Sequence, residues 1–321
     1  MKIGKLIALV LSMAVLASCA AKPVSAAPKK VTLVAKSTET EFWKSVFAGA
    51  TAAASEYNVA LTIVGPETEE DYEAQNAYIE KAVADGAEAL VFSAISYTEN
   101  ASAINAAAAA GVEVVVIDSD VDSMSVGARI GTDNVEAGYM AARAALEQSE
   151  GDMVLGLINY DLGSRNGQER EQGLRELLMG NERVRGIYTI NVLAEADDAK
   201  EKTLDLLTRH REINVVVGFN EPTAVGAAQA VAALDLDEDM TVVGFDSNVE
   251  TVDLMQEGVV SALIVQNPYA MGYLGVEAAC QRLDGVAFDS QSFINTSTQI
   301  VTKENMFSLE GQKALFPFDA S

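Results

Sequence analysis

Short apolar segments alternate with segments of helical period along most of the chain. The apolar segments are rich in valine and isoleucine, and most are followed by a stretch in which apolar residues recur every three to four positions. This alternation predicts buried parallel strands, each followed by a helix that crosses back over the sheet. The predicted strands are Val31–Ala35, Val59–Val64, Glu88–Phe92, Val112–Ile117, Val126–Ile130, Met153–Leu157, Val184–Ile190, Asn214–Gly218, Thr241–Phe245 and Ser261–Val265. The predicted helices are Phe42–Tyr57, Asp71–Ala84, Ala101–Ala110, Val135–Gln148, Gln168–Met179, Ala196–Arg209, Thr223–Leu234 and Val249–Gln256.

The number of these units indicates the fold class. Ten predicted strands exceed the eight of a single (β/α)₈ barrel, and 321 residues are enough for two domains of ordinary size. We therefore expect an α/β protein built from two doubly wound, parallel sheets. In open sheets of this kind, ligands bind beyond the carboxyl ends of the strands. The residues that follow each strand are therefore the first candidates for a functional site.

The amino-terminal residues have a different pattern. Residues 1–18 combine two lysines with a short apolar run, which is typical of a secretory signal peptide and too short for a permanent membrane helix. Small residues precede Cys19, and the segment resembles a bacterial lipobox, in which the cysteine is diacylated and becomes the first residue of the mature protein. An ordinary signal peptide with a chance cysteine is the alternative. Residues 19–30 then form a predicted tether before the folded body.

Composition argues against several classes of function. The chain has 47 acidic and 22 basic residues, a formal charge of −25, whereas a nucleic-acid binder needs a basic surface. With one histidine and two cysteines, Cys19 and Cys280, we expect no metal site and no disulfide framework. The sequence motifs of serine hydrolases, zinc proteases and phosphate-binding loops are missing. We therefore expect neither an enzyme nor a bound cofactor.

Aromatic and acidic residues follow strands in the first half of the chain. Phe42 and Trp43 open the first predicted helix, where they either form a stacking wall for a ring-shaped ligand or pack into the core. Asp118 follows the fourth strand, and its carboxylate either accepts hydrogen bonds from ligand hydroxyl groups or caps a helix.

Polar residues follow the strands of the second half as well. Arg170 lies near the start of a predicted helix, where a positive charge is disfavoured, so it either points to an acceptor or is a solvated surface residue. Asn220, Asp246 and Gln266 each follow a strand, and each can form hydrogen bonds. Together with Asp118, these residues predict a polar cleft that is lined from both sheets and suits a polyhydroxylated ligand.

Five short motifs occur in a specific order and spacing. They are Glu41-Phe42-Trp43, Val116-Ile117-Asp118, Gly131-Thr132-Asp133-Asn134, Val242-Val243-Gly244-Phe245-Asp246 and Val265-Gln266-Asn267-Pro268. In this respect the chain resembles a type I periplasmic sugar-binding protein of the ribose, galactose and autoinducer-2 group, over about residues 31–303. The resemblance implies two lobes that are joined by three crossover strands and close on a sugar. The first lobe would hold residues 31–132 and 267–297, and the second would hold residues 133–266 and 298–321.

The resemblance also implies a role for each candidate residue. Two aromatic residues would stack on the sugar, two aspartates would accept hydrogen bonds from its hydroxyl groups, and three further residues would donate to or bridge its oxygens. These are Phe42 and Trp43, Asp118 and Asp246, and Arg170, Asn220 and Gln266, respectively. Thr40 and Ser119 stand where ribose binders carry asparagine and arginine, so both are further candidates, and ribose itself becomes a less favoured ligand.

The function implied by the resemblance is that of a lipid-anchored solute-binding protein on the extracytoplasmic face of a bacterial cell membrane. It would act as a monomer and deliver a monosaccharide-like ligand to an ABC permease and its ATPase. A receptor that presents its ligand to a membrane histidine kinase uses the same lobes and is the alternative. Sugar-responsive repressors share these lobes too, but they begin with a helix-turn-helix, whereas this chain begins with a predicted signal peptide.

Overall fold

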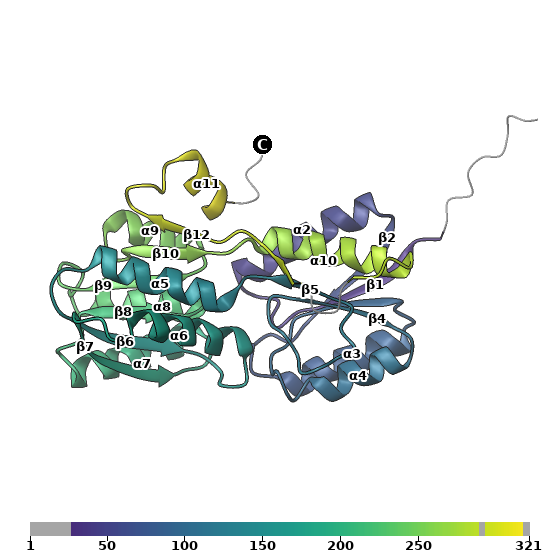
Figure 1. The fold of residues 1–321 in the computed structure, drawn as a ribbon, viewed down its shortest axis with the longest axis horizontal. Helices are drawn as coiled ribbons and strands as arrows, with labels where there is room; N and C mark the ends of the chain where they lie inside the picture. Colours follow the sequence, from purple (N-terminus) through teal and green to yellow (C-terminus); the bar gives the residue numbers. More distant parts are fainter. Residues whose placement is uncertain (1–26, 289–292, 317–321) are drawn as a thin grey trace, which may run out of the picture.

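The computed structural model describes residues 27–288 and 293–316, and within them the chain forms two six-stranded sheets with helices on both faces (Figure 1). The first sheet has the strand order β11-β5-β4-β3-β1-β2, and its neighbouring strands are parallel. Its strands are β1 (Lys29–Val34), β2 (Val59–Val64), β3 (Ala89–Phe92), β4 (Glu113–Ile117), β5 (Ala128–Gly131) and β11 (Phe293–Asn295).

The second sheet repeats this arrangement with the order β12-β10-β9-β8-β6-β7. Its strands are β6 (Met153–Asn159), β7 (Val184–Asn191), β8 (Val215–Gly218), β9 (Thr241–Phe245), β10 (Ala262–Val265) and β12 (Gln299–Thr302). Only the edge strand β12 runs antiparallel to its neighbour, β10, among the strands that the structure describes.

We call each sheet with its helices a lobe. The helices of the first lobe are α2 (Glu41–Glu56), α3 (Tyr72–Ala84), α4 (Ala101–Ala109) and α10 (Pro268–Leu283). Those of the second lobe are α5 (Asn134–Gln148), α6 (Arg165–Leu178), α7 (Ala196–Arg209), α8 (Glu221–Ala233), α9 (Val249–Glu257) and α11 (Leu309–Leu315). The chain passes between the lobes after β5, after β10 and after β11 (Figure 1). The expected fold class, with two doubly wound lobes and three crossovers, is thereby confirmed.

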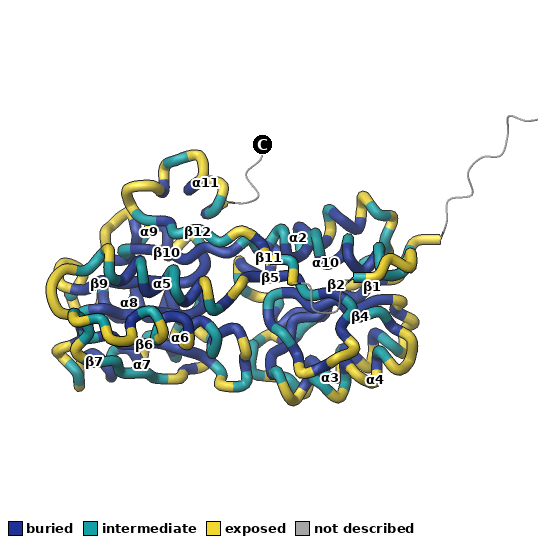
Figure 2. The backbone as a smooth tube through the Cα atoms, in the orientation of Figure 1, coloured by how far each residue is buried: buried dark blue, intermediate teal, exposed yellow. Residues whose placement is uncertain are grey.

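Each sheet lies between two apolar layers. In β3, Ala89 and Val91 pack into the cluster that contains α2 and α10, whereas Leu90 and Phe92 pack into the cluster that contains α3 and α4. Successive side chains of a strand point to opposite faces, so a strand that is buried on both faces needs a continuous apolar sequence. The buried segments accordingly follow the strands through the middle of each lobe (Figure 2).

The structure differs from the expected elements mainly near the chain ends. Strand β1 begins at Lys29, because Lys29 and Lys30 pair with Val59 and Ala60. These two lysines therefore belong to the sheet and not to the predicted tether. The two edge strands β11 and β12 and the helix α11 were not among the predicted elements.

The predicted signal peptide and the lipobox Cys19 lie outside the described residues. Among the residues that the structure does describe, no helix combines the length and the apolar character that a membrane crossing requires.

Candidate ligand-binding site

Loops at the carboxyl ends of both sheets meet between the lobes and enclose a cavity of about 20 Å³, which we call the cleft. This volume holds about one water molecule, so the cleft must widen to admit a ring-shaped ligand. Its lining comes from both lobes and consists of Lys36, Thr40, Phe42, Glu69, Asp118, Tyr160, Asn166, Arg170, Asn220, Glu221, Pro222, Asp246 and Gln266. Seven of the residues predicted from the sequence lie here: Thr40, Phe42, Asp118, Arg170, Asn220, Asp246 and Gln266.

The two predicted aspartates occupy equivalent places in the two lobes. Asp118 follows β4 with φ of +55°, and Asp246 follows β9 with φ of +65°. Aspartate is one of the few residues that adopts this left-handed conformation at modest cost. The backbone N–H of each donates to the neighbouring strand, Asp118 to Ile130 O and Asp246 to Ile264 O, both at 3.0 Å. The sharp turn after each strand thus places a carboxylate at the cleft.

Asp118 is held by neutral donors. Its Oδ2 accepts from Ser93 Oγ at 2.9 Å, and its Oδ1 accepts from Asn166 Nδ2 at 3.2 Å. Burial raises the pKa of Asp118 above its ordinary value, although the positive charges of Lys36 and Arg170 oppose the shift.

Asp246 is linked to the crossover segment that follows β10. Its Oδ1 accepts from Gln266 Nε2 at 2.7 Å. Burial raises the pKa of Asp246 to about 7, against the opposing effects of the Arg170 charge and the Gln266 hydrogen bond. Gln266 Oε1 is buried and finds no hydrogen-bond partner within the described residues. It can therefore accept a hydrogen bond from a ligand.

Arg170 is 1% exposed and lies close enough to both aspartates to influence their pKa values. Its Nε donates to Asn134 Oδ1 at 2.9 Å, its Nη1 donates to Phe219 O at 2.8 Å, and its guanidinium lies 4.6 Å from the centre of the Phe245 ring. Nη2 is buried and has no partner in the part of the chain that the structure describes. Of the two alternatives for Arg170, the solvated surface residue is therefore wrong.

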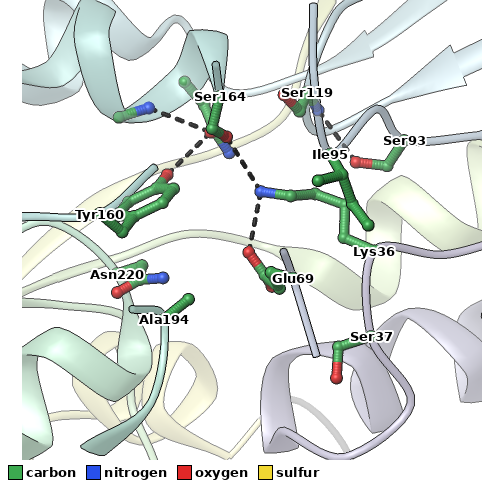
Figure 3. Close-up of polar contacts among 12 residues, drawn as sticks. Lys36, Ser37, Glu69, Ser93, Ile95, Ser119, Tyr160, Ser164, Ala194 and Asn220 are labelled. Carbon is green, nitrogen blue, oxygen red and sulfur yellow. Dashed lines mark hydrogen bonds and ion pairs between the residues drawn. The ribbon is translucent and has the colours of Figure 1, made fainter. Parts of the chain in front are cut away.

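Lys36 adds a second buried cation that the sequence reading missed. Its Nζ forms an ion pair with Glu69 Oε2 at 2.8 Å and donates to Ser164 Oγ at 3.1 Å, which crosses from the first lobe to the second (Figure 3). Burial lowers the pKa of Lys36, but its interactions with Glu69, Tyr160 and Asp118 together outweigh this effect, so the net pKa is raised and the amine stays protonated. A lysine directly after the buried, mainly apolar end of a strand was a signal that could have identified it.

Tyr160, Asn166 and Glu221 also line the cleft without having been predicted. Tyr160 brings an aromatic ring of the second lobe to the cleft. Its hydroxyl group donates to Asn166 Oδ1 at 2.7 Å, which fixes the ring. Glu221 Oε2 accepts from Phe42 N at 2.9 Å, across the boundary between the lobes. Burial raises the pKa of Glu221, although the Phe42 hydrogen bond opposes this shift.

The two predicted aromatic residues have different surroundings. Phe42 lines the cleft, whereas Trp43 is 1% exposed and belongs to the apolar core of the first lobe. The two rings meet edge to face with centres 5.3 Å apart, and Trp43 Nε1 donates to Glu69 Oε1 at 2.9 Å. Trp43 therefore contacts Phe42 and Glu69, the residue that pairs with Lys36, from the core side of the cleft. Direct stacking of Trp43 on a ligand stays a prediction.

The remaining candidates are at helix starts and in a neighbouring loop. Thr40 and Asn220 are the N-caps of α2 and α8, and Asn220 forms a reciprocal capping box with Thr223. Both residues still line the cleft, so capping and ligand contact are compatible. Ser119 lies one residue beyond the cleft lining, and its buried Oγ has no partner among the described residues.

The structure shows the lobes in contact on the cleft side of the crossovers. Besides the bonds already described, Tyr97 N donates to Gly163 O at 2.9 Å, and Ala194 N donates to Glu70 Oε1 at 2.7 Å. Each bond joins the first lobe to the second. The molecule is therefore in a closed form, with its polar residues converging from both sides.

The comparisons with known proteins agree with this geometry. The sequence matches the family described as periplasmic binding protein domain over residues 31–287. It is 26% identical to the ribose import binding protein of Bacillus subtilis over 296 residues, which cover 89% of this chain and 94% of that protein. A solved carbohydrate transporter solute-binding protein from Agrobacterium radiobacter, in complex with D-arabinose, has a TM-score of 0.86 at 26% identity and covers 91% of this chain and 100% of its own. An ABC transporter solute-binding protein from Agrobacterium vitis with bound D-fucose has a TM-score of 0.84 at 26% identity, over 89% of this chain and 99% of its own.

The family match spans most of the residues that the structure describes. It includes nearly all of both lobes and the two aspartates that follow β4 and β9. The chain therefore belongs to the periplasmic binding protein family, in the type I sugar-binding group that its motifs resemble.

Proposed function

We propose that this protein is an extracytoplasmic solute-binding protein that captures a monosaccharide or a similar polyhydroxylated ligand by lobe closure and delivers it to an ABC importer. The relatives support this proposal, because those described above are named for ribose import or were solved with bound sugars. The ligand would contact residues of both lobes at once, so its binding would favour the closed form over the open one.

The observation that carries the proposal is an incomplete hydrogen-bond network in the cleft. Arg170 Nη2 and Gln266 Oε1 are buried without partners in the described part of the chain, next to the carboxylates of Asp118 and Asp246. An unsatisfied buried polar group costs about 1–3 kcal/mol, so such groups are rare unless something complements them. Sugar hydroxyl groups both donate and accept, and they can therefore satisfy the donor, the acceptor and the carboxylates together.

The test is calorimetry of the mature protein against pentoses, hexoses, inositols and autoinducer-2. We expect at least one of these ligands to bind and Asp246→Asn to weaken its binding at least about ten-fold, because an amide does not replace a carboxylate as acceptor for two hydroxyl groups. Asparagine tolerates the left-handed backbone at this position, so the variant should fold. The exposed Asp253→Asn on α9 is the control and should bind like the wild type. If no ligand in the panel binds, the proposal is wrong.

A sensory receptor for a membrane histidine kinase remains the alternative, since it would use the same cleft. Reconstitution separates the two functions. A binding protein of an importer stimulates ATP hydrolysis by its permease complex when loaded with ligand, whereas a sensory receptor changes kinase autophosphorylation instead.

We also propose that Cys19 carries a lipid anchor. Two acyl chains are what stable membrane attachment requires, and the charge of −25 opposes attachment by attraction to anionic lipids. Labelling of cells with radioactive palmitate should mark the wild type and leave Cys19→Ala unlabelled. The second cysteine, Cys280, is buried in α10, so Cys280→Ala is the matched control and should keep the label. Label that persists without Cys19 would contradict the anchor.

A further inference from the structure

A second cavity of about 250 Å³ adjoins the cleft, and no expectation from the sequence pointed to it. We call it the side compartment. It lies between the start of α2, the start of α9 and the carboxyl-terminal helix α11. Phe42, Asp246 and Gln266 line both the cleft and the side compartment. The two spaces therefore share walls, and a ligand held by Asp246 and Gln266 stands at the boundary between them.

The wall of the side compartment carries two buried polar atoms without partners among the described residues. They are Ser45 Oγ on α2 and Gln266 Oε1 on the crossover segment that follows β10. Ser45 is 3% exposed and Gln266 is 4% exposed, so solvent scarcely reaches either residue. A serine hydroxyl can donate to an ether oxygen, and an amide oxygen can accept from a ligand hydroxyl group.

Apart from Asp246, the other polar residues of the wall are Glu41, Ser247 and Asn248, and their side chains already have partners within the protein. The rest of the wall is apolar and is completed by the carboxyl-terminal helix. Val265 and Pro268 form one side, and Ala314, Leu315 and Phe316 cover the other. Leu315 packs into the core of the second lobe, and its carbonyl accepts from Ser247 Oγ at 3.3 Å, which fixes α11 over the compartment. This wall suits an apolar group more than a second sugar ring, which would need several hydroxyl partners.

On the basis of the function proposed above, we propose that the ligand is a polyhydroxylated ring with an apolar substituent, joined through an ether or glycosidic oxygen, and that the substituent occupies the side compartment. The ring lies in the cleft between Asp118 and Asp246. The linking oxygen accepts from Ser45 Oγ, a ring hydroxyl donates to Gln266 Oε1, and the substituent packs against Val265 and Leu315. The helix α11 thus selects for the substituent, whereas the cleft selects for the ring.

The experiment compares parent sugars with their derivatives. Calorimetry on the mature protein would use the parent sugar that binds best in the panel and its O-methyl and O-phenyl derivatives at each ring position. We expect one derivative to bind at least about ten-fold more tightly than the parent, the effect of burying about two methylene groups. Ala314→Phe, which fills the compartment, should abolish this advantage and leave the parent affinity within about two-fold.

Two further variants make the result specific. Lys313→Phe adds the same ring to the same helix at an exposed position outside the compartment, and it should keep the advantage of the derivative. Val249→Trp narrows the compartment from its exposed side without repacking α11, and it should reduce the advantage as Ala314→Phe does.

The outcomes separate the two proposals. If a parent sugar binds but no derivative binds more tightly, the substituent is wrong and the sugar-binding function stands. If Ala314→Phe weakens the parent and the derivative equally, the compartment does not hold the substituent, and the inference is overturned. If neither parents nor derivatives bind, the proposed function fails and the inference fails with it.

Discussion

At the scale of single residues, the cleft concentrates charges that would be costly in isolation. Arg170 acts on both Asp118 and Asp246, and Lys36 pairs with Glu69, so each buried cation has acidic neighbours. Buried charges are retained only when they are paired and hydrogen-bonded, which explains the dense network around them. At Asp246 the effect of burial exceeds the compensation from these neighbours, since its pKa is raised to about 7.

This raised pKa predicts how stability depends on pH. The carboxyl group of Asp246 has a pKa of about 7 in the folded state and an ordinary value of 3.8, so it stays protonated to a higher pH in the folded protein than in the unfolded chain. Its contribution to stability is present below about pH 4 and is lost as the pH rises towards 7, with a slope of at most about 1.4 kcal/mol per pH unit. Asp246→Asn removes this dependence, so the variant should gain stability relative to the wild type between pH 5 and 7.

Urea denaturation of both proteins at pH 5, 6, 7 and 8 measures this difference. The exposed Asp253→Asn sets the baseline for the loss of one negative charge. The prediction fails if the free energies of unfolding of Asp246→Asn and the wild type differ by a constant amount at all four pH values.

Residues that directly follow strands were readable from the sequence, but their partners were not. Asp118, Asp246 and Gln266 were found because a parallel sheet places its functional residues at the strand ends. Glu69 and Glu221 lie in a loop and at a helix start, where an acidic residue usually faces solvent, and only the folded chain brings them to Lys36 and Phe42. Trp43 illustrates the opposite difficulty, since sequence cannot separate a stacking residue from the core residue that supports it.

At the scale of elements, close packing of α5 against α6 positions Arg170. A Cβ atom at Gly138 of α5 would lie 2.1 Å from Arg170 O, and one at Gly173 of α6 would lie 2.0 Å from Val135 O. These distances are far shorter than any normal contact, so the two helix backbones touch only because both positions are glycine. The Arg170 side chain then reaches Asn134 at the start of α5.

We therefore predict that Gly138→Ala displaces α6 and disturbs Arg170. Overpacking of this kind costs about 1–3 kcal/mol of stability, and the shift should also weaken ligand binding by at least several-fold. Gly186→Ala in β7 is the matched control, because its nearest contact would be Val154 at 3.7 Å, an ordinary distance. Thermal denaturation and calorimetry measure the two effects. A Gly138→Ala protein with wild-type stability and affinity would contradict this account of the packing.

The elements that the sequence did reveal are those with strong local patterns. Strands such as β2 and β9 were predicted at their observed bounds, because each is a short segment dominated by β-branched and apolar residues. The edge strands β11 and β12 are short and partly polar, and they form only because β5 and β10 offer them an unpaired edge. Helix α11 has too few residues to show a clear helical period in the sequence. It is held in place because Leu315 packs into the core of the second lobe.

At the scale of the whole molecule, the carboxylate of Glu221 connects the second lobe to the start of a helix in the first lobe. Glu221 of the second lobe accepts from Phe42 N at 2.9 Å, and Asn248 Nδ2 donates to it at 3.0 Å. The amino terminus of a helix carries a partial positive charge and unpaired N–H groups, so an anion there is favourable. Because α2 and Glu221 belong to different lobes, this contact stabilises the closed form specifically.

The last prediction follows from this bridge. Glu221→Gln removes the anion at α2, which is worth about 0.3–1 kcal/mol at exposed sites and up to about 2 kcal/mol when partly buried. The closed population should fall, and ligand affinity should fall with it by about two- to ten-fold, since binding requires closure.

Small-angle X-ray scattering should then show a larger radius of gyration for the variant without ligand and recovery of the compact form at saturating ligand. The exposed Glu41→Gln also removes a charge from the first turn of α2 but leaves the contact between the lobes intact, so it should behave like the wild type. Equal expansion of both variants would mean that the charge acts on the helix itself and not on closure.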